Sequence, residues 1–465
     1  MKVKKVLYVV LIVIAFYLLS VAIPYVKHKE VKASTKENFN PQDCYSDKVG
    51  LERVQAILEA KESMEMNLRA INEAKESIQV ATYKLMPDQA GKDLMAALME
   101  AADRGVKVEF ITNGINEFLD LKNSPYIKAF ANYNNVEFYI YNKISVLKPW
   151  KIQASLHSKY LVCDDKMYLL GGRNMFNLFM GDYGKHHNKD CELLVYETGD
   201  ADQTSLAQVR AYHQQLLALS DVVGYHPKKT ATKVNQATEE LRQRRADLRR
   251  KYPKVYQDYD WLAKTVPTNK VTLLNTPIAA KNKRPDLWYY LNELAKQGEE
   301  VSIYTPYIIA GKEMYQDLTR LSKEVDQVSI ITNAVENGAN PFGCSDYLNQ
   351  RDNILATNVK VHEFSGQDSL HMKAWLIDDS MSVVGSFNMD MRSTYIDTEL
   401  MLAVDSKDLN QILRADFNKT LQGTRCLEGE HYQYEKNYLN KEMKPIKKVI
   451  YAIMRLTSTF TRRFL

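Results

Sequence analysis

One polar pattern occurs twice in this chain, and the repetition limits the folds open to it. Residues 155–174 read SLHSKYLVCDDKMYLLGGRN, and residues 369–388 read SLHMKAWLIDDSMSVVGSFN. Each copy contains His-x-Lys, four residues, an Asp, six residues, a Gly-Gly or Gly-Ser pair, one residue and an Asn. Because the match is one of position, the two stretches are expected to occupy equivalent places in two similar halves.

The similarity extends beyond the two motifs. Residues 76–86 resemble residues 300–310, and residues 106–118 resemble residues 325–337, both of which contain Ile-Thr-Asn. In each half the order is an apolar strand, a helix, a strand ending in Ile-Thr-Asn, a further strand and the motif. Residues 91–105 show helical apolar spacing and end in Gly. The pattern predicts an α/β fold of two duplicated sandwich lobes packed about a pseudo-twofold axis.

The amino-terminal end predicts a membrane helix. Residues 6–23, VLYVVLIVIAFYLLSVAI, contain no charged side chain, and at about 1.5 Å per residue they span roughly 27 Å as a helix. A cleaved signal peptide is the alternative, but its apolar core has about 7–15 residues and precedes an A-x-A-like site. No such site closely follows this run, so we predict an uncleaved single-pass anchor.

The charges beside this segment bear on its orientation. Lysines lie on both sides of it, at Lys2, Lys4, Lys5, Lys27, Lys29 and Lys32. The positive-inside rule is therefore almost balanced. The free amino terminus tips it toward an N-terminus inside the cell, which would place the folded part outside the cytoplasm.

Basic charge gathers at the two ends of the chain. The formal net charge is +5, whereas residues 1–32 carry +5 and residues 441–465 carry +6, so the remainder carries −6. A body of this charge does not favour a nucleic-acid partner. Between residues 444 and 465, apolar and basic side chains share a helical pattern typical of a helix in an anionic lipid interface. The residues are Ile446, Ile450, Ile453, Phe460 and Phe464, with Lys447, Lys448, Arg455, Arg462 and Arg463. The alternative is a helix docked on its own protein.

These features divide the chain into six predicted regions. The folded parts are lobe 1, residues 46–227, and lobe 2, residues 269–425. The rest comprise an anchor at 1–26, a linker at 27–45, a charged helical connector at 228–268 and a basic amphipathic tail at 426–465. The charge run of the connector is interpreted as a solvated helix face.

The paired motifs carry groups suited to phosphodiester chemistry. On a strand, residues i and i+2 point to one face, so His157 and Lys159 share a cleft, and His371 and Lys373 repeat the arrangement. One His can attack phosphorus while the other protonates the leaving oxygen. The lysines, with the amides of Asn174 and Asn388, can stabilise the non-bridging oxygens. This set requires neither a metal nor another cofactor.

Four carboxylates complete the predicted site. DCELLV at 190–195 aligns with DTELML at 397–402, which makes Glu192 and Glu399 the predicted orienting groups for His157 and His371 respectively. Asp164 and Asp378 follow their lysines by five residues, an odd spacing that points them to the opposite strand face. We interpret them as structural carboxylates that hold adjacent backbone or basic groups.

The two motifs resemble the signature of the phospholipase D superfamily, H-x-K-x4-D-x6-G-[GS]-x-N, at every position. The matching residues are His157, Lys159, Asp164, Gly171, Gly172 and Asn174, then His371, Lys373, Asp378, Gly385, Ser386 and Asn388. Residues 171–179 and 385–400, with the membrane segment, are most similar to bacterial cardiolipin synthases, many of which have two such segments. The resemblance implies metal-independent phosphatidyl transfer, with His157 as the nucleophile and His371 as the acid and then the base.

Several functions remain open to such a chain. The first is cardiolipin synthesis from phosphatidylglycerol at a membrane that residues 6–23 and the tail contact. Hydrolysis of phospholipids to phosphatidic acid would use the same residues, with water as the acceptor. A nuclease of the superfamily is disfavoured by the acidic body. A membrane-bound scaffold with an inactive site is disfavoured by two intact motifs.

Overall fold

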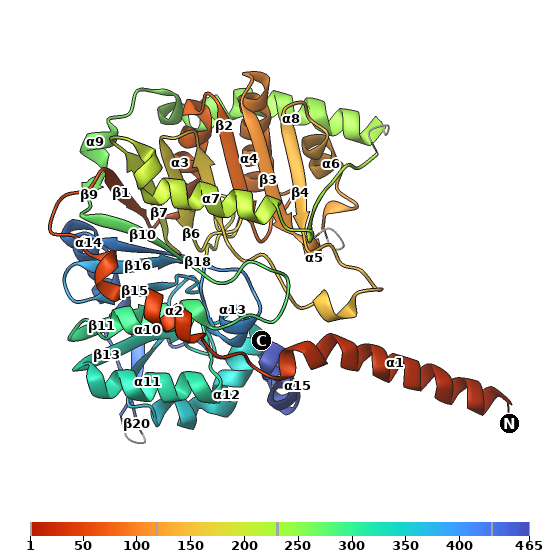
Figure 1. The fold of residues 1–465 in the computed structure, drawn as a ribbon, viewed down its shortest axis with the longest axis vertical. Coiled ribbons are helices and arrows are strands. Elements are labelled where there is room, and N and C mark those ends of the chain that lie inside the picture. Colours follow the sequence, from red (N-terminus) through yellow and green to blue (C-terminus); the bar gives the residue numbers. More distant parts are fainter. Residues whose placement is uncertain (1, 117–119, 229–231, 429–430, 465) are drawn as a thin grey trace.

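The computed structural model describes residues 2–116, 120–228, 232–428 and 431–464. Two nine-stranded mixed sheets dominate it (Figure 1). In spatial order the first contains β8 (Val222–Gly224), β4 (Val136–Tyr141), β3 (Lys107–Asn113), β2 (Ser77–Thr82), β5 (Tyr160–Cys163), β6 (Met167–Gly171), β7 (Glu192–Glu197), β1 (Glu52–Ile57) and β9 (Val266–Pro267). The second contains β10 (Lys270–Asn275), β18 (Leu400–Asp405), β16 (Met381–Gly385), β15 (Ala374–Ile377), β11 (Glu300–Tyr304), β13 (Gln327–Asn333), β14 (Lys360–Phe364), β19 (Thr424–Glu428) and β20 (His431–Tyr434).

The two sheets have matching cores. In the first, β4, β3 and β2 are parallel and β2, β5, β6 and β7 are antiparallel neighbours. In the second, β14, β13 and β11 are parallel and β11, β15, β16 and β18 are antiparallel neighbours. The strands that carry the two motifs therefore occupy equivalent places, which confirms the duplicated α/β fold. A short parallel pair joins β12 (Ile308–Ile309) to β17 (Met389–Asp390).

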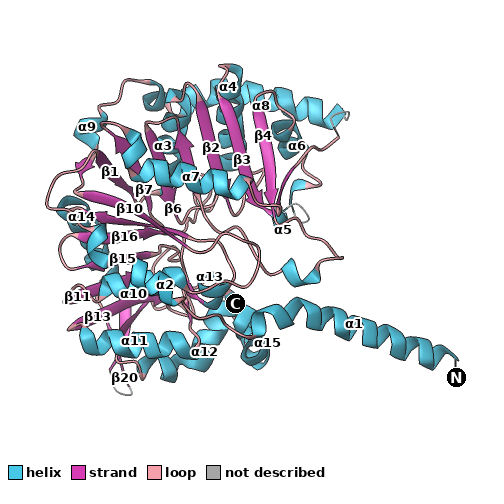
Figure 2. Ribbon diagram, viewed as in Figure 1, coloured by secondary structure: helices cyan, strands magenta, loops and turns pink. Residues whose placement is uncertain are grey.

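Helices cover the sheets (Figure 2), and one core of buried side chains contains residues of both lobes. Alternate residues of β5 face opposite sides, as a strand buried on both faces requires. Leu161 and Cys163 join the core under the first lobe's helices, whereas Tyr160 and Val162 join a core that continues into the second lobe. The helices of the first lobe are α3 (Ala60–Glu73), α4 (Gln89–Asp103), α5 (Gly114–Asn116), α6 (Pro125–Ala131) and α7 (Ser205–Leu217). Those of the second are α10 (Asp286–Ala295), α11 (Lys312–Glu324), α12 (Pro341–Leu355), α13 (Met391–Tyr395) and α14 (Lys407–Leu421).

The charged segment between the lobes is helical but not fully solvated. It forms α8 (Thr232–Lys251), followed by η5 (Pro253–Tyr256) and α9 (Trp261–Lys264). Leu241 and Leu248 of α8 are buried in the first lobe's core. Arg245 and Arg249 form ion pairs with Asp103 and Glu100 of α4. The charge run thus docks α8 on the first lobe, because acidic partners lie opposite it.

The two ends of the chain meet beside the second lobe. Helix α1 (Lys2–Val26) projects from the body (Figure 1), and its stretch Lys4–Val26 has a mean hydropathy of 2.9 with none of its apolar window buried. It is long and apolar enough to cross a bilayer. Helix α2 (Ala33–Asn38) and η1 (Pro41–Cys44) lead from it into β1.

Near the other end, α15 (Pro445–Thr461) packs on α12 and is followed by η6 (Arg462–Phe464). The Arg463 guanidinium donates to the carbonyl oxygen of Val26, at the end of α1. The two chain ends are therefore tied together at the base of the projecting helix.

Candidate active site

Each motif histidine lies in an extended segment that pairs with the other lobe. The His157 backbone N–H donates to the Thr398 carbonyl at 3.1 Å, and the Thr398 N–H donates to the Ser155 carbonyl at 2.9 Å. In the equivalent exchange the His371 N–H donates to the Lys189 carbonyl at 2.7 Å. The two motifs therefore cross between the sheets, as a pseudo-twofold arrangement requires.

An asparagine of each lobe fixes the segment ahead of the histidine. The Leu156 N–H donates to the Asn113 side-chain oxygen at 3.0 Å, and the Leu370 N–H donates to that of Asn333 at 2.8 Å. These asparagines end the two Ile-Thr-Asn strands, which explains why that sequence recurs in both halves. The His-x-Lys residues were predicted on a strand, but they precede β5 and β15, which begin at Tyr160 and Ala374.

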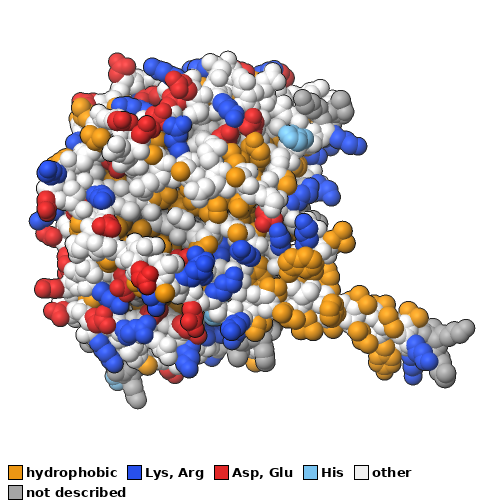
Figure 3. All heavy atoms as spheres, in the orientation of Figure 1, with side chains coloured by type: hydrophobic (Ala, Val, Ile, Leu, Met, Phe, Trp, Pro, Cys, Tyr) orange, Lys and Arg blue, Asp and Glu red, His pale blue; other side chains and the backbone are white. Residues whose placement is uncertain are grey.

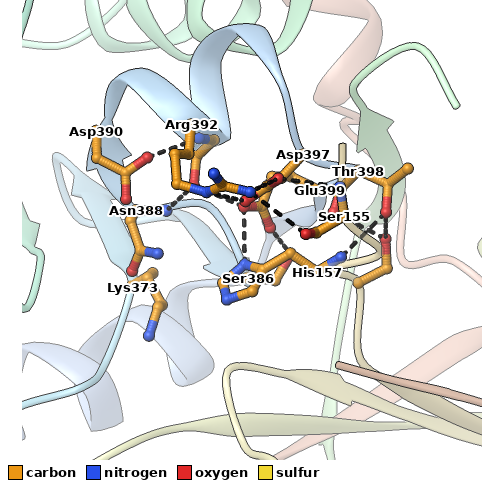
Figure 4. A network of polar contacts seen from close by, with 12 residues as sticks. Ser155, His157, Lys373, Ser386, Asn388, Asp390, Arg392, Asp397, Thr398 and Glu399 are labelled. Atoms are coloured by element: carbon orange, nitrogen blue, oxygen red, sulfur yellow. Dashed lines mark hydrogen bonds and ion pairs between the residues drawn. The ribbon is translucent and has the colours of Figure 1, made fainter. Parts of the chain in front are cut away.

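Each imidazole is hydrogen-bonded to a buried carboxylate of the opposite lobe. His157 Nδ1 lies 2.8 Å from Glu399 Oε1, and His371 Nδ1 lies 2.6 Å from Asp190 Oδ2. Both carboxyl side chains are inaccessible to solvent. With Nδ1–H donated to the carboxylate, each ring presents Nε2 as its reactive atom. Figure 4 shows His157 among Ser386, Thr398 and Glu399 of the second lobe.

The predicted pairing of Glu192 with His157 and of Glu399 with His371 is wrong. Glu192 accepts a hydrogen bond from Ser63 and lies 3.9 Å from the Arg173 guanidinium. Its carboxylate is thus engaged within its own lobe. The crossed backbone pairing is the reason, because it brings each histidine segment to the acidic segment of the other lobe.

The two lysines lie directly beside the histidines, as predicted. Lys159 Nζ donates to the carbonyl oxygen of His157, and Lys373 Nζ donates to that of His371. Lys373 Nζ is also 2.7 Å from His371 Nδ1 and 3.2 Å from its Nε2. Both ammonium groups are buried. Burial lowers the pKa of Lys159 to about 7 and that of Lys373 to about 8, although nearby carboxylates favour their charged forms.

The same electrostatics keep both imidazoles neutral. Burial, and then the charge of Lys159, holds the pKa of His157 well below its usual value. Burial and Lys373 lower the pKa of His371 to about 3, against the opposing effect of Asp190. An anion placed between the two ammonium groups would offset these effects and raise both pKa values.

The two orienting carboxylates differ in their ease of ionisation. Burial raises the pKa of Glu399 to about 7, although Lys159 and two hydroxyl groups oppose the shift. Burial also disfavours the charged form of Asp190, but Lys373 and His371 outweigh it and lower its pKa. An ionised carboxylate stabilises an imidazolium directly, so His371 is the better placed of the two to carry a proton.

Asn174 and Asn388 occupy the equivalent last positions of the two motifs, and Figure 4 shows Asn388 beside Lys373. Both residues are buried, and within the described parts of the chain neither side-chain oxygen has a hydrogen-bond partner. Buried polar groups without partners are rare in folded proteins. Two equivalent ones at the ends of the paired motifs indicate a place for a polar ligand.

Asp164 and Asp378 lie away from the histidines, as expected of structural carboxylates. Each follows a motif strand at positive φ, +52° and +47°, in the left-handed region. The Asp164 carboxylate accepts the backbone N–H groups of residues 75–77, and that of Asp378 accepts those of residues 299–300. Each therefore anchors the start of the neighbouring antiparallel strand, β2 for Asp164 and β11 for Asp378.

The Gly-Gly and Gly-Ser pairs determine which acid can approach. A Cβ on Gly172 would lie 2.4 Å from Asp190 Oδ1, so that position must be glycine for Asp190 to reach His371. At the equivalent position, Ser386 Oγ donates to Glu399 Oε2 at 2.5 Å. Ser393 Oγ donates to Glu399 Oε1 at 2.6 Å. The glycine makes room for one acid, and the serine holds the other.

Sequence reasoning missed four charged residues here. Asp190 aligns with Asp397, and that alignment could have identified Asp190 as a candidate orienting acid. Asp397 instead forms an ion pair with the partly buried Arg392, 2.9 Å away. Lys283 is buried, and its ammonium has no hydrogen-bond partner among the described residues. Burial lowers the pKa of Lys283 to about 7, although Asp397 and Glu399 favour its charged form. Lys283 lies outside both motifs, so the repeat gave no indication of it.

The described residues hold no group of three or more His, Cys, Asp and Glu side chains that could bind a metal ion. The donors at this site are instead two ammonium groups and two imidazoles whose Nδ1 atoms are engaged by carboxylates. Such a set complements an anion with phosphate-like oxygens.

Comparison with known proteins places these features in a family. The family model described as cardiolipin synthase, PLD-like domain, matches residues 68–208 and 290–421, one segment in each lobe. Cardiolipin synthase C of Escherichia coli is 21% identical over 376 residues, covering 74% of this chain and 79% of that protein. Cardiolipin synthase 1 of Staphylococcus aureus is 21% identical over 389 residues, covering 82% and 69% respectively.

A solved structure shares the fold. The phosphatidylserine synthase of Haemophilus influenzae superposes with a TM-score of 0.63 at 16% sequence identity, covering 93% of this chain and 100% of that one. The duplicated architecture is therefore known in another protein of very different sequence.

Proposed function

The chain belongs to the family of the cardiolipin synthase PLD-like domain, and from this membership we propose that it is a membrane-anchored phosphatidyltransferase that makes cardiolipin from phosphatidylglycerol. The crossed pair of imidazoles carries the proposal. Each has Nδ1 on a buried carboxylate of the other lobe and a lysine beside it. Two reactive nitrogens across an anion site are what a double displacement at phosphorus needs.

The first displacement loads the enzyme. Nε2 of neutral His157 attacks the phosphorus of one phosphatidylglycerol, an N–P bond forms, and the P–O bond to the terminal glycerol breaks. His371 gives its proton to the departing oxygen, and free glycerol leaves. The ammonium groups of Lys159 and Lys373 stabilise the charge that develops on the non-bridging oxygens.

The second displacement releases the product. His371, now neutral, takes the proton from the glycerol hydroxyl of a second phosphatidylglycerol, and that oxygen attacks the phosphorus. The N–P bond to His157 breaks and cardiolipin forms. One phosphodiester replaces another, so the exchange is close to isoenergetic and needs no nucleotide.

Substrate binding allows His371 to take up from solvent the proton that this scheme requires. In the empty site Lys373 and burial hold the pKa of His371 at about 3. A phosphodiester anion between Lys159 and Lys373 raises that pKa, because it neutralises the nearby positive charge. His371 therefore becomes an effective acid only when substrate is bound.

The membrane attachment is proposed on two elements. Helix α1 spans the bilayer, with the folded part outside the cytoplasm. The apolar side chains of α15 contact the lipid surface; its exposed apolar residues are Ile446, Val449, Ile450, Ile453 and Leu456. The other side of α15 docks on the protein, since Tyr451 is buried and Arg462, just beyond the helix, pairs with Asp346. Phe460, also predicted on the lipid face, has a side chain outside the described ones.

A product assay tests the proposal. The purified chain, supplied with phosphatidylglycerol vesicles, is expected to release glycerol and to form cardiolipin without nucleotide, and a chelator should leave the rate unchanged. The matched control is the His157→Ala variant. Phosphatidic acid as the sole product would assign the chain as a hydrolase. Activity on nucleic acid alone would reject a lipid substrate.

A further inference from the structure

A loop of the first lobe exposes apolar side chains that nothing in the catalytic scheme uses. Residues 143–151 follow β4 and end in η3 (Pro149–Lys151). Leu147 is 83% exposed, Val146 71% and Trp150 47%. Single exposed apolar residues are ordinary, but a contiguous group at a loop tip indicates contact with a partner or a membrane.

This loop lies against the base of the projecting helix. The Tyr25 hydroxyl donates to the Trp150 carbonyl at 3.0 Å, and the Tyr25 side chain is buried. Val21 and Tyr17, one and two helical turns earlier on the same face, are partly buried, whereas most of the helix is exposed. In Figure 1 the yellow-orange loop extends outward beside α1. A bilayer around α1 would therefore meet the loop tip.

The base of the loop is positively charged. A hollow of about 320 Å³ is lined by Lys143, Lys148 and Lys151, and Asp221 is the single acidic residue in its lining. Lys151 forms an ion pair with Asp221. Apolar side chains at a tip with lysines behind them are the arrangement of an element that enters an anionic lipid interface.

We propose that residues 143–151 form a membrane-insertion loop, with Val146, Leu147 and Trp150 in the acyl boundary and the loop lysines among anionic headgroups. The proposal rests on α1 lying in the bilayer, as the proposed function has it. Figure 3 shows apolar side chains gathered where α1 leaves the body. The loop comes from the first lobe and α15 from the second, so with α1 they attach both lobes to one lipid surface.

Depth-dependent quenching tests this in the full chain. A single cysteine is introduced at Val146, labelled with bimane and reconstituted into phosphatidylglycerol–phosphatidylcholine vesicles that carry shallow nitroxide lipids. The matched control is Val49, which is also 71% exposed and precedes β1, on the side opposite α1 in Figure 1. A third label at Ile12, near the middle of α1, is read against nitroxides placed deep in the acyl chains and reports on α1 itself. The unsubstituted chain, labelled in parallel, gives the contribution of the native cysteines.

The expected result is a fluorescence loss of about 2-fold or more at Val146 and little change at Val49, because inserted apolar groups lie about 5–10 Å into the headgroup–acyl boundary. The loss should be smaller in vesicles of phosphatidylcholine alone. Equal quenching in the two lipids would overturn the role of the lysines. Quenching at Ile12 without quenching at Val146 would overturn the loop while leaving the anchor intact. Absence of quenching at both positions would overturn both.

Discussion

The two half-sites hold equivalent histidines with different acids. His371 is paired with Asp190, which reaches it past Gly172, whereas His157 is paired with Glu399, which Ser386 and Ser393 hold in place. The acid not used in each lobe has a structural role. Glu192 bonds to Ser63, and Asp397 pairs with Arg392.

This difference shows how a symmetric fold can serve an asymmetric reaction. Because its pKa is lowered, the Asp190 carboxylate stays negatively charged beside His371. This charge stabilises the protonated imidazole, which suits a residue that must carry a proton. Glu399 ionises less readily, since burial raises its pKa to about 7, so it favours a neutral imidazole on His157. A neutral imidazole is the nucleophile.

The largest expected effect comes from removing the imidazoles one at a time. His157→Ala and His371→Ala should each reduce turnover of phosphatidylglycerol by about 10³-fold or more, at the upper range for a lost acid–base group or nucleophile. A phosphodiester with a p-nitrophenyl leaving group needs no proton donor. With it, His371→Ala should still accumulate a phosphohistidine and His157→Ala should not, as measured by mass spectrometry of the neutral-quenched protein. A label on His371 would reverse the assignment.

A smaller effect is expected from the orienting acids. Asp190→Asn and Glu399→Gln should each reduce kcat by about 10–100-fold, as is usual when the group that orients a reactive imidazole is lost. Because Asp190 favours the protonated form of His371, Asp190→Asn should also move the His371 limb of the pH–rate profile to lower pH.

The control for this comparison is Glu192→Gln, at the position aligned with Glu399. Its carboxylate contacts Ser63 and not His157, so kcat should stay close to that of the parent protein. If Glu192→Gln lost as much activity as Glu399→Gln, each histidine would be oriented by the Glu of its own lobe, and the crossed pairing of acids and histidines would be refuted.

The smallest expected effect concerns Lys283, whose buried ammonium interacts electrostatically with Asp397 and Glu399. Its pKa is about 7 in the folded protein and 10.5 without burial, so the unfolded chain binds more protons between those values and stability rises with pH there. Lys283→Met should raise the free energy of unfolding by about 1–3 kcal/mol at pH 7, since an unpartnered buried polar group is removed. The gain is complete below pH 7 and should fade toward pH 10.

Denaturant titrations at several pH values measure this gain. Lys296→Met is the control, because the Lys296 ammonium already forms an ion pair with Glu293 on α10. Its removal therefore relieves no unpaired buried charge. A pH-independent gain in Lys283→Met would show that its cause is packing and not the buried charge.

Repetition made much of this molecule predictable. The paired motifs predicted both histidines, both lysines and both asparagines as site residues, and the flanking repeats predicted the order of strands in each lobe. The orienting acids were not predictable in the same way. Each lobe carries both an Asp and a Glu at aligned positions, and which one meets a histidine depends on how the lobes cross. That contact joins residues 242 positions apart, a separation at which local pattern carries no information.

The connector shows a second limit. The composition of α8 predicted a solvated helix, and Arg242, Arg249 and Arg250 do lie at the surface. The acids that they meet, Glu100 and Asp103, lie on α4 and are spaced to match only in the folded lobe. A charge run alone does not reveal whether its partner is water or another helix.

The crossing of the two histidine segments also sets when the chain can become active. Glu399 is added 242 residues after His157, and at about 5–20 residues per second that interval lasts roughly 12–50 s. During this interval the first lobe has the His157 imidazole but not the Glu399 carboxylate that orients it. It also has only one of the two site lysines. A nascent chain in which only the first lobe has folded therefore lacks a complete site, and activity begins when the second lobe has emerged and docked.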